Sequence, residues 1–522
     1  MAGAGRDVAE RLYVRLVPGA LTSWIVTAAG IVWPVGRACA SGCLLLALGA
    51  GVLWWITDRR PRSRRWPCAV SAGLVTVGVV GAGFGMAIAL RTEALASHPI
   101  SAAFGTSAAV TVTPSESALS LGSDRLMFRA TIQRLRDDEI SGRVVVFARA
   151  FEFEEMGELM VGRPVRFTAR ISGPARHDLT VAVLNSAGAV KAGRAGALQR
   201  AAHQVCGRFA AAARRVLPAD QAAMLPALVL GDTSTVSTET GRAFRSAGMT
   251  HLTAVSGANV TIVCGAVRCG AVRCGAVLFS ARWVGPRAAV ALAGIALVAF
   301  VVVVQPTASV LRAALMASIA LAAMLSSRRR QAIPALSTTV LVLLVAAPHL
   351  AVDMGFALSV VATAALVVVA PGWSDGLVVR GWPKVLADGL AVATAAQVVT
   401  APLVAAISGR FSVVAVVANL AVAAVIAPIT VLGSAAAVLV IPWPAGAQLL
   451  IRFTGPQVWW VLHVARWAAD VPGATVAVPA GLAGVLIVGG VTVLVVALWR
   501  FRWIRLAMIS ALLATQGSGV VD

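Results

Sequence analysis

Polar side chains gather in one stretch, residues 231–260, which separates a mostly polar part of the chain from a mostly apolar one. The stretch offers a carboxylate, an imidazole, a hydroxyl and an amide, at Asp232, His251, Ser256 and Asn259. Polar groups are costly where lipid excludes water, unless protein or enclosed water satisfies them. The stretch is therefore a candidate functional site.

Each of these side chains has a functional and a structural interpretation. Asp232 could bind a cation or pair with an arginine, or it could cap a turn after Gly231. His251 could titrate near neutral pH beside a water-filled path, or it could be structural. Ser256 and Asn259 could hydrogen-bond a transported chain, or they could join helix to helix.

The composition indicates a membrane protein with several spans. Of the 522 residues, 59% are hydrophobic and only 13% are charged, whereas a soluble domain carries about 25% charged residues. The net charge is +22, almost all of it from arginine. Basic residues also gather in cytoplasmic loops to set topology, so this charge does not by itself indicate nucleic acid.

Long apolar runs predict a polytopic α-helical membrane protein of about 10–11 spans, with a small exterior β-barrel between spans 3 and 4. The positive-inside rule places the N-terminus in the cytoplasm and residues 91–230 outside. Pro428 is expected to break the apolar run 411–440. The predicted runs lie near residues 19–36, 39–57, 68–90, 286–305, 309–326, 334–348, 354–371, 386–408, 411–440 and 480–499.

The exterior region alternates between apolar and polar residues over 126–132 and 165–171, which predicts half-buried strands. Short strands with Gly and Pro turns favour a small barrel, and the OB-fold is one option. Phe147, Phe151 and Phe153 could stack bases, although a place in the core is favoured. Between Asp124 and Asp178 ten arginines face nine acidic residues, so the net charge is near zero.

Ordered motifs support a family resemblance. Gly231-Asp232, then Phe244 and Gly248, then the sequence HLTAVSG at 251–257 resemble the signature of the ComEC family of competence membrane proteins, which pass single-stranded DNA into bacteria. The family usually has a histidine where this chain has Asn259. Further similar elements are the helix start at 306–312, the GFALS sequence at 355–359, Gln397, Pro402 and Asn419.

The resemblance implies an OB-like exterior domain and a DNA path through the membrane. Arg312 is the best lining candidate, because a guanidinium binds phosphate through two charge-assisted hydrogen bonds. Ser309 is expected to cap its helix, whose N-terminus also favours phosphate. The alternative for Arg312 is a snorkelling position at the membrane interface. Gln397 and Asn419 could line the path or pack helices.

No motif indicates an enzyme. The sequence has no Walker A loop and no HExxH. The HxHxDH signature of the metallo-β-lactamase-like domain that many family members carry is not found, so we expect no nuclease activity. We predict no cofactor and no metal. The expected partners are single-stranded DNA and membrane lipid, with an exterior DNA receptor, a cytosolic motor ATPase, a separate nuclease and a second copy of the chain as further candidates.

The sequence thus predicts an inner-membrane channel for single-stranded DNA uptake in natural transformation. Two alternatives stay open: a small-molecule or ion transporter, and a non-transporting membrane scaffold for DNA-handling partners. The predicted domains are a membrane anchor at 1–90, an OB-like domain at 91–195, an amphipathic connector at 196–230, a transmembrane channel domain at 231–505 and a tail at 506–522.

Overall fold

The chain is mostly helical and contains one closed β-barrel, as predicted. Five helical segments of the described residues are long and apolar enough to cross a membrane, and shorter apolar helices accompany them. The predicted 10–11 spans would require most of these shorter helices to cross as well. The computed structural model describes residues 15–58, 65–116, 118–120, 125–149, 161–174, 176–253, 259–267, 286–304, 308–325 and 332–500.

Two compact units divide the chain, and each draws on several segments. The first holds the residues up to Val236, then His251–Ala357 and Ile426–Val458. The second holds Ser237–Thr250, Leu358–Val425 and the residues from Trp459 onward. The stretch 231–260 therefore contributes to both units.

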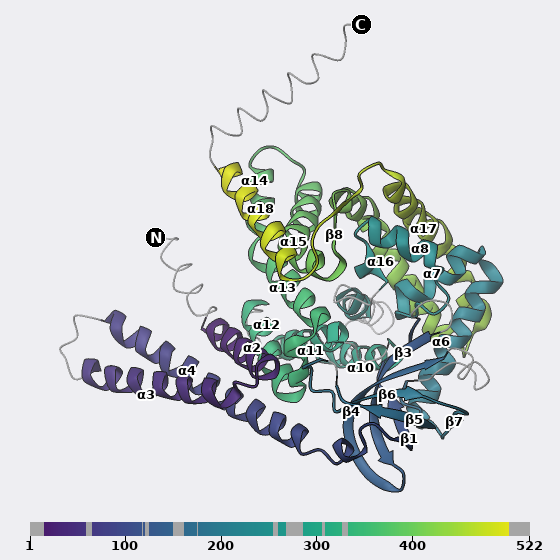
Figure 1. Cartoon of the computed structure of the whole chain (residues 1–522). Helices are drawn as coiled ribbons and strands as arrows, with labels where there is room; N and C mark the ends of the chain where they lie inside the picture. Colours follow the sequence, from purple (N-terminus) through teal and green to yellow (C-terminus); the bar gives the residue numbers. More distant parts are fainter. Residues whose placement is uncertain are drawn as a thin grey trace, which may run out of the picture. The chain divides into compact units, whose positions relative to one another are not determined.

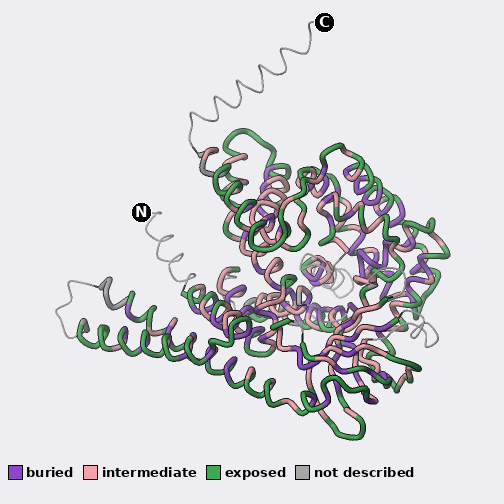
Figure 2. The backbone as a smooth tube through the Cα atoms, in the orientation of Figure 1, coloured by how far each residue is buried: buried purple, intermediate pink, exposed green. Residues whose placement is uncertain are grey.

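The first unit begins with three apolar helices, α2 (Leu16–Val32), α3 (Gly36–Asp58) and α4 (Arg65–Ala96). Helices α3 and α4 lie side by side as a hairpin (Figure 1). A Cβ added to Gly78 of α4 would lie 2.6 Å from the carbonyl oxygen of Cys43 on α3. Small residues allow such close approach between membrane helices. Much of α3 is exposed and apolar (Figure 2), as suits a helix surrounded by lipid.

A closed barrel follows the short helix η1 (Pro99–Ala103). Its strand order is β1-β3-β4-β6-β5, and β5 pairs back to β1. Only β4 and β6 pair in parallel among these strands. The short β2 pairs with β3, and the short β7 pairs with β5 (Figure 1 labels β7). The strands are β1 (Ser107–Pro114), β2 (Leu119–Ser120), β3 (Arg125–Leu135), β4 (Asp138–Arg149), β5 (Val165–Ser172), β6 (Ala182–Ser186) and β7 (Lys191–Ala192).

Every second side chain of the main strands points into the barrel core, as the sequence predicts. Phe128 and Ile132 of β3 and Phe167 and Ile171 of β5 point into the core. One expectation is wrong: Phe147 lies on the outer side of β4, half-buried, with the Arg125 guanidinium 5.9 Å from its ring centroid. A period of two explains this, because the neighbouring positions 146 and 148 take the core face. Phe151 and Phe153 lie outside the described residues.

The other described residues of the first unit are mostly helical, and residues 259–267 also form a helix. The predicted connector, residues 196–230, holds α6 and α7, and α6 buries Ala202, Phe209 and Ala213 and exposes its arginines. The elements are α6 (Ala197–Val216), α7 (Ala219–Leu230), α10 (Pro286–Val304), α11 (Ala308–Leu325), α12 (Ala332–Ala346), and the short helices η2 (Thr250–Leu252) and η3 (Pro348–Val352).

The second unit is built around packed helices and a two-stranded sheet. Helix α15 packs on α18 through Ala401, Ala405 and Val488. The strands β8 and β9 pair antiparallel beside them. The elements are α8 (Thr238–Ser246), α14 (Ala370–Val378), α15 (Lys384–Ser408), β8 (Arg410–Ser412), β9 (Thr475–Ala477) and α18 (Leu482–Arg500).

Three further helices have residues in both units: α13 (Met354–Val368), α16 (Ala415–Leu439) and α17 (Pro444–Asp470). The expected break at Pro428 is wrong, because α16 continues through it. Proline is tolerated within membrane helices, since neighbouring helices and small local adjustments satisfy the freed backbone groups.

Candidate functional site

The polar stretch begins where α7 ends. Gly231 takes a left-handed conformation with φ of 76°, and its N–H donates to the carbonyl of Ala227 at 3.1 Å. Glycine suits this position because it has no Cβ to clash. Asp232 follows and accepts two hydrogen bonds through Oδ1, from the backbone N–H of Ser234 at 3.1 Å and from its hydroxyl at 2.6 Å. Asp232 therefore stabilises the turn after α7.

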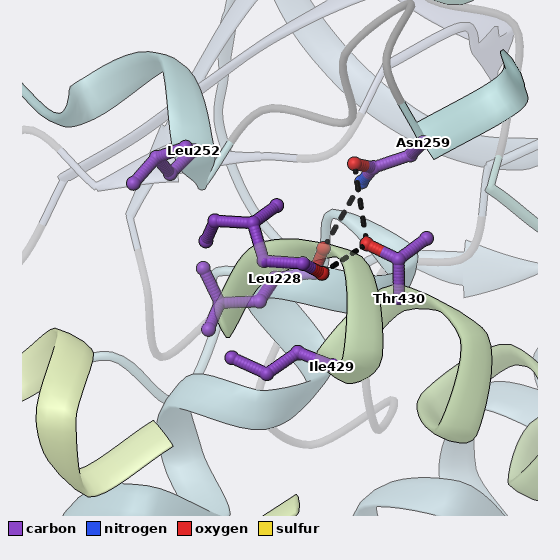
Figure 3. A pocket seen from close by; sticks show the side chains of 6 residues that line it. Leu228, Leu252, Asn259, Ile429 and Thr430 are labelled. Carbon is purple, nitrogen blue, oxygen red and sulfur yellow. Dashed lines mark hydrogen bonds between the residues drawn. The ribbon is translucent and has the colours of Figure 1, made fainter. Parts of the chain in front are cut away.

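Asn259 lies at the centre of a buried polar contact in the first unit. Its side chain is 4% exposed, and its Nδ2 donates to the carbonyl oxygen of Leu228 at 3.2 Å. That carbonyl belongs to the last turn of α7, where helix carbonyls lack partners in the helix itself. The Thr430 hydroxyl donates to Asn259 Oδ1 at 3.5 Å and to the carbonyl of Ile426 at 2.9 Å (Figure 3). The amide thus connects the end of α7 to α16.

A small pocket adjoins this contact. Its lining is mostly apolar, and the Asn259 and Thr430 side chains supply the polar groups (Figure 3). The lining residues are Leu228, Leu252, Asn259, Ile426, Ile429 and Thr430. Leu252 belongs to the predicted HLTAVSG motif, so the motif reaches this pocket through an apolar side chain. His251, its neighbour, is exposed in η2. Ser256 lies outside the described residues.

In the second unit, two predicted amides bind backbone carbonyls. Asn419 Nδ2 donates to the carbonyl of Gly248 at 3.4 Å, and Gln397 Nε2 donates to the carbonyl of Ser412 at 3.3 Å. The Ser412 hydroxyl in turn donates to the carbonyl of Ser246 at 2.6 Å. These bonds hold the end of α8 and the turn after it against α15 and α16. Both amides therefore have the packing role that the sequence allows.

Gly248 is the tightest point of this cluster. Its φ is +67°, and a Cβ there would lie 2.5 Å from the Cβ of Ala415. Only glycine fits both the left-handed backbone and the space. This explains, in physical terms, why the motif has glycine at this position.

Arg312 lies in α11 and is 6% exposed. One of its Nη atoms is 3.4 Å from the sulfur of Met316, one turn along the helix. Its neighbours Val310 and Ala313 are also buried. The side chain thus turns inward and does not snorkel outward along the helix. Ser309, the expected cap, is the second residue of α11 as the structure describes that helix.

A second polar cluster, which the sequence did not indicate, joins the barrel to η3. Arg129 of β3 lies 3.7 Å from Asp353 and 3.3 Å from Glu116. Asp353 also accepts a hydrogen bond from the N–H of Phe356 at 2.7 Å. Burial, then the nearby Arg143 and Arg129, lower the pKa of His349 to about 4. Burial also lowers the pKa of Arg143, and Arg129 adds to the effect.

The predicted site residues are thus divided between the two units. Asn259 reaches a pocket of the first unit, Gln397 and Asn419 hold a turn of the second, and Asp232 bonds locally. Thr430, Ser412 and the barrel cluster were missed, since a single Thr or Ser in an apolar run carries no signal of its partner. Among the described residues, no group of three or more His, Cys, Asp or Glu side chains could hold a metal.

A comparison with known families gives one match. The model described as Competence protein matches residues 228–503, which is more than half of the chain. The matched range runs from the end of α7 past α18 and contains every predicted site residue. The resemblance stated from the motifs is confirmed at the level of this family. No curated protein and no solved structure matches the chain.

Proposed function

As the chain belongs to the competence-protein family, we propose that it passes single-stranded DNA across the cell membrane during DNA uptake. The observation that carries this proposal is the extent of the family match, which coincides with the segment where polar motif residues enter apolar helices. Family and apolar helices together identify a membrane protein with a role in DNA uptake. That the chain forms a channel for single-stranded DNA is our proposal and goes beyond the family match.

The polar residues support such a route in two ways. Asn259 and Thr430 place hydrogen-bonding groups next to a pocket whose other lining residues are apolar. At membrane depth, polar groups are tolerated where the protein itself satisfies them or where they line a cavity. Arg312 brings a permanent positive charge inside the helices of the first unit. An ionisable side chain in that place is a functional candidate by default. We assign Arg312 to phosphate binding as strands pass.

The proposed orientation has the N-terminus in the cytoplasm and the barrel outside. Basic clusters near residues 59–65, 328–330 and 380–384 then all face the cytoplasm, as the positive-inside rule requires. We propose that a cytosolic ATPase supplies the work and that another protein degrades the second strand. In this proposal the chain itself binds and conducts, and catalyses no reaction.

The first test is import of labelled DNA into cells with and without this gene. Treatment with DNase separates DNA in the cytosol from DNA on the surface. The proposal expects DNase-resistant label to disappear on deletion and to return with the complete chain. Equal import in both strains would refute it. Metabolite or ion flux that depends on the gene, with no change in DNA import, would favour the transporter alternative.

The second test addresses Arg312. An Arg312→Gln chain should insert at the normal level and lose most DNA import, because the amide keeps bulk but not charge. Arg380→Gln is the matched control, since Arg380 is exposed in the turn after α14. Normal import by the Arg312→Gln chain would remove this side chain from the route. Loss of import by both chains would point to a general charge effect.

A further inference from the structure

One group of basic residues, in and just after the barrel, lies apart from the acidic side chains that the structure describes there. Residues 161–177 and 186–219 contain no Asp or Glu. The acidic side chains described in the barrel lie mainly on the β3–β4 hairpin, where Glu139 pairs with Arg134 at 2.7 Å. Among the described residues of the barrel, charge is therefore unevenly distributed.

Strand register brings these basic residues together. Arg166 lies on the outer face of β5, directly opposite Lys191 of β7. Arg163 precedes β5 and donates through Nε to the carbonyl of Gly193 at 3.0 Å, which places Arg194 beside it. All four side chains belong to one edge of the barrel.

Helix α6 continues this edge. Its first turn rests on the barrel, because Gln199 packs so closely on Gly162 that a Cβ there would lie 2.6 Å from Gln199 Cγ. From this point Arg200, Arg208 and Arg215 are all exposed and lie within about a quarter turn of one another around the helix, since eight and fifteen residues end about 80° and 60° from the starting direction. We call the edge and this side of the helix together the basic track: Arg163, Arg166, Lys191, Arg194, Arg200, Arg208 and Arg215.

The track is under electrostatic strain in the free protein. Like charges directly opposite each other in a sheet destabilise it, as Arg166 and Lys191 are. Within the described part of the chain, no salt bridge to an acidic residue relieves Arg166, Lys191 or Arg194. A bound polyanion would remove the repulsion. The four glutamates of 151–160 lie outside the described residues, and neutralisation by them would abolish the binding that we test below.

We propose that single-stranded DNA binds along the basic track, held by its phosphates. The inference rests on the proposed function and assigns the exterior surface that receives the strand. The track runs from one strand edge along a helix, a shape that suits a chain of phosphates. None of its seven residues is aromatic, so binding proceeds without the base stacking that OB-folds use.

Lipid headgroups fit the track less well. A helix that lies in the membrane interface inserts large apolar side chains into it. In α6 the large Phe209 is buried within the protein, and the exposed side carries Arg, Gln, Gly and Ala. Leu198, which is exposed, lies away from that side.

Binding can be measured with the full chain in lipid nanodiscs of neutral lipid, using fluorescein-labelled (dT)20 and anisotropy over a range of salt. The test chain carries Arg166→Gln, Lys191→Gln and Arg194→Gln. A control chain carries Arg134→Gln, Arg380→Gln and Arg410→Gln, which removes the same charge from exposed positions outside the track. Each lost phosphate contact on a single strand lowers the slope of log K against log salt by about 0.7.

We expect the test chain to bind at least tenfold more weakly at 0.1 M salt and to lose about two units of slope, with the control unchanged. Equal affinity of the test and control chains for (dT)20 would overturn the proposal that DNA binds along the basic track. A wild-type chain that does not bind (dT)20 would overturn it as well. Vesicles of phosphatidylglycerol that bind the wild type through the same residues, without competition by DNA, would assign the track to lipid. These outcomes leave the proposed function standing, because only unchanged import after gene deletion refutes that.

Discussion

Replacement of Gly248 by alanine tests whether this position requires glycine because of its limited space and its left-handed backbone. The added Cβ would lie 2.5 Å from the Cβ of Ala415, well inside van der Waals contact. Ala415 is the first residue of α16 and is fully buried, so it has little room to move. The substitution therefore forces the turn after α8 away from α16, and with it the carbonyl that Asn419 binds.

Two contributions set the size of the effect. A left-handed backbone costs a residue with a Cβ about 1–2 kcal/mol. Overpacking at a buried contact costs about 1–3 kcal/mol. Together they predict that Gly248→Ala lowers the free energy of unfolding by about 2–5 kcal/mol. Removing the opposing Cβ with Ala415→Gly should abolish the second contribution only.

The measurement is a double-mutant cycle on unfolding of the purified chain in mixed SDS–detergent micelles. Ala415→Gly alone should cost up to about 1 kcal/mol, the usual penalty of glycine in a helix. The double variant should be more stable than the sum of the single effects by about 1–3 kcal/mol. Gly241→Ala is the control, because a Cβ at Gly241 of α8 meets no atom within 4 Å. Additive effects, or a Gly248→Ala chain as stable as wild type, would refute the argument.

Three further outcomes are expected. Asn259→Leu should cost about 1–3 kcal/mol in the same unfolding assay, because it leaves a buried carbonyl at the end of α7 unpaired, and Thr430→Val should cost less. The pKa of His349 is about 4, below its value in the unfolded chain, so folding favours the neutral imidazole. The free energy of unfolding should therefore be highest above about pH 6.5 and fall by about 1–3 kcal/mol toward pH 4. A His349→Gln chain should lose this pH dependence in melting experiments. Gly78→Ala should push α3 away from α4, detected as faster proteolysis, whereas Gly73→Ala should not, because a Cβ at Gly73 meets no atom within 4 Å.

The barrel could be predicted from sequence because its signal is local. Alternation along β3 and β5 assigns each residue to one of two faces, and Phe128 and Phe167 take the core as expected. Phe147 shows the limit of using residue type alone, since hydrophobicity suggested a core position and the strand period placed it outside. Pro428 shows the same limit in helices, where packing in α16 overrides propensity.

The site could be predicted only in part, because its contacts join distant segments. Polarity within an apolar region drew attention to Asn259, Gln397 and Asn419, and the structure shows a hydrogen bond from each amide. Their partners follow from tertiary packing: Thr430 is 171 residues from Asn259, and Gly248 is 171 residues from Asn419. A sequence shows which side chains need a partner, but not which carbonyl will accept the bond.

In the exterior domain, the placement of the charged residues matters more than their sum. Ten arginines against nine acidic residues give the exterior domain a net charge near zero. Register then set Arg166 against Lys191 on the outer face of the barrel, with the paired acidic side chain Glu139 on another hairpin. Since exposed charges interact over only about 10 Å at 0.1 M salt, a distant carboxylate does little to weaken such a pair. A strand of DNA that approaches that edge would meet mainly the charges within about 10 Å of it, and not the average charge of the domain.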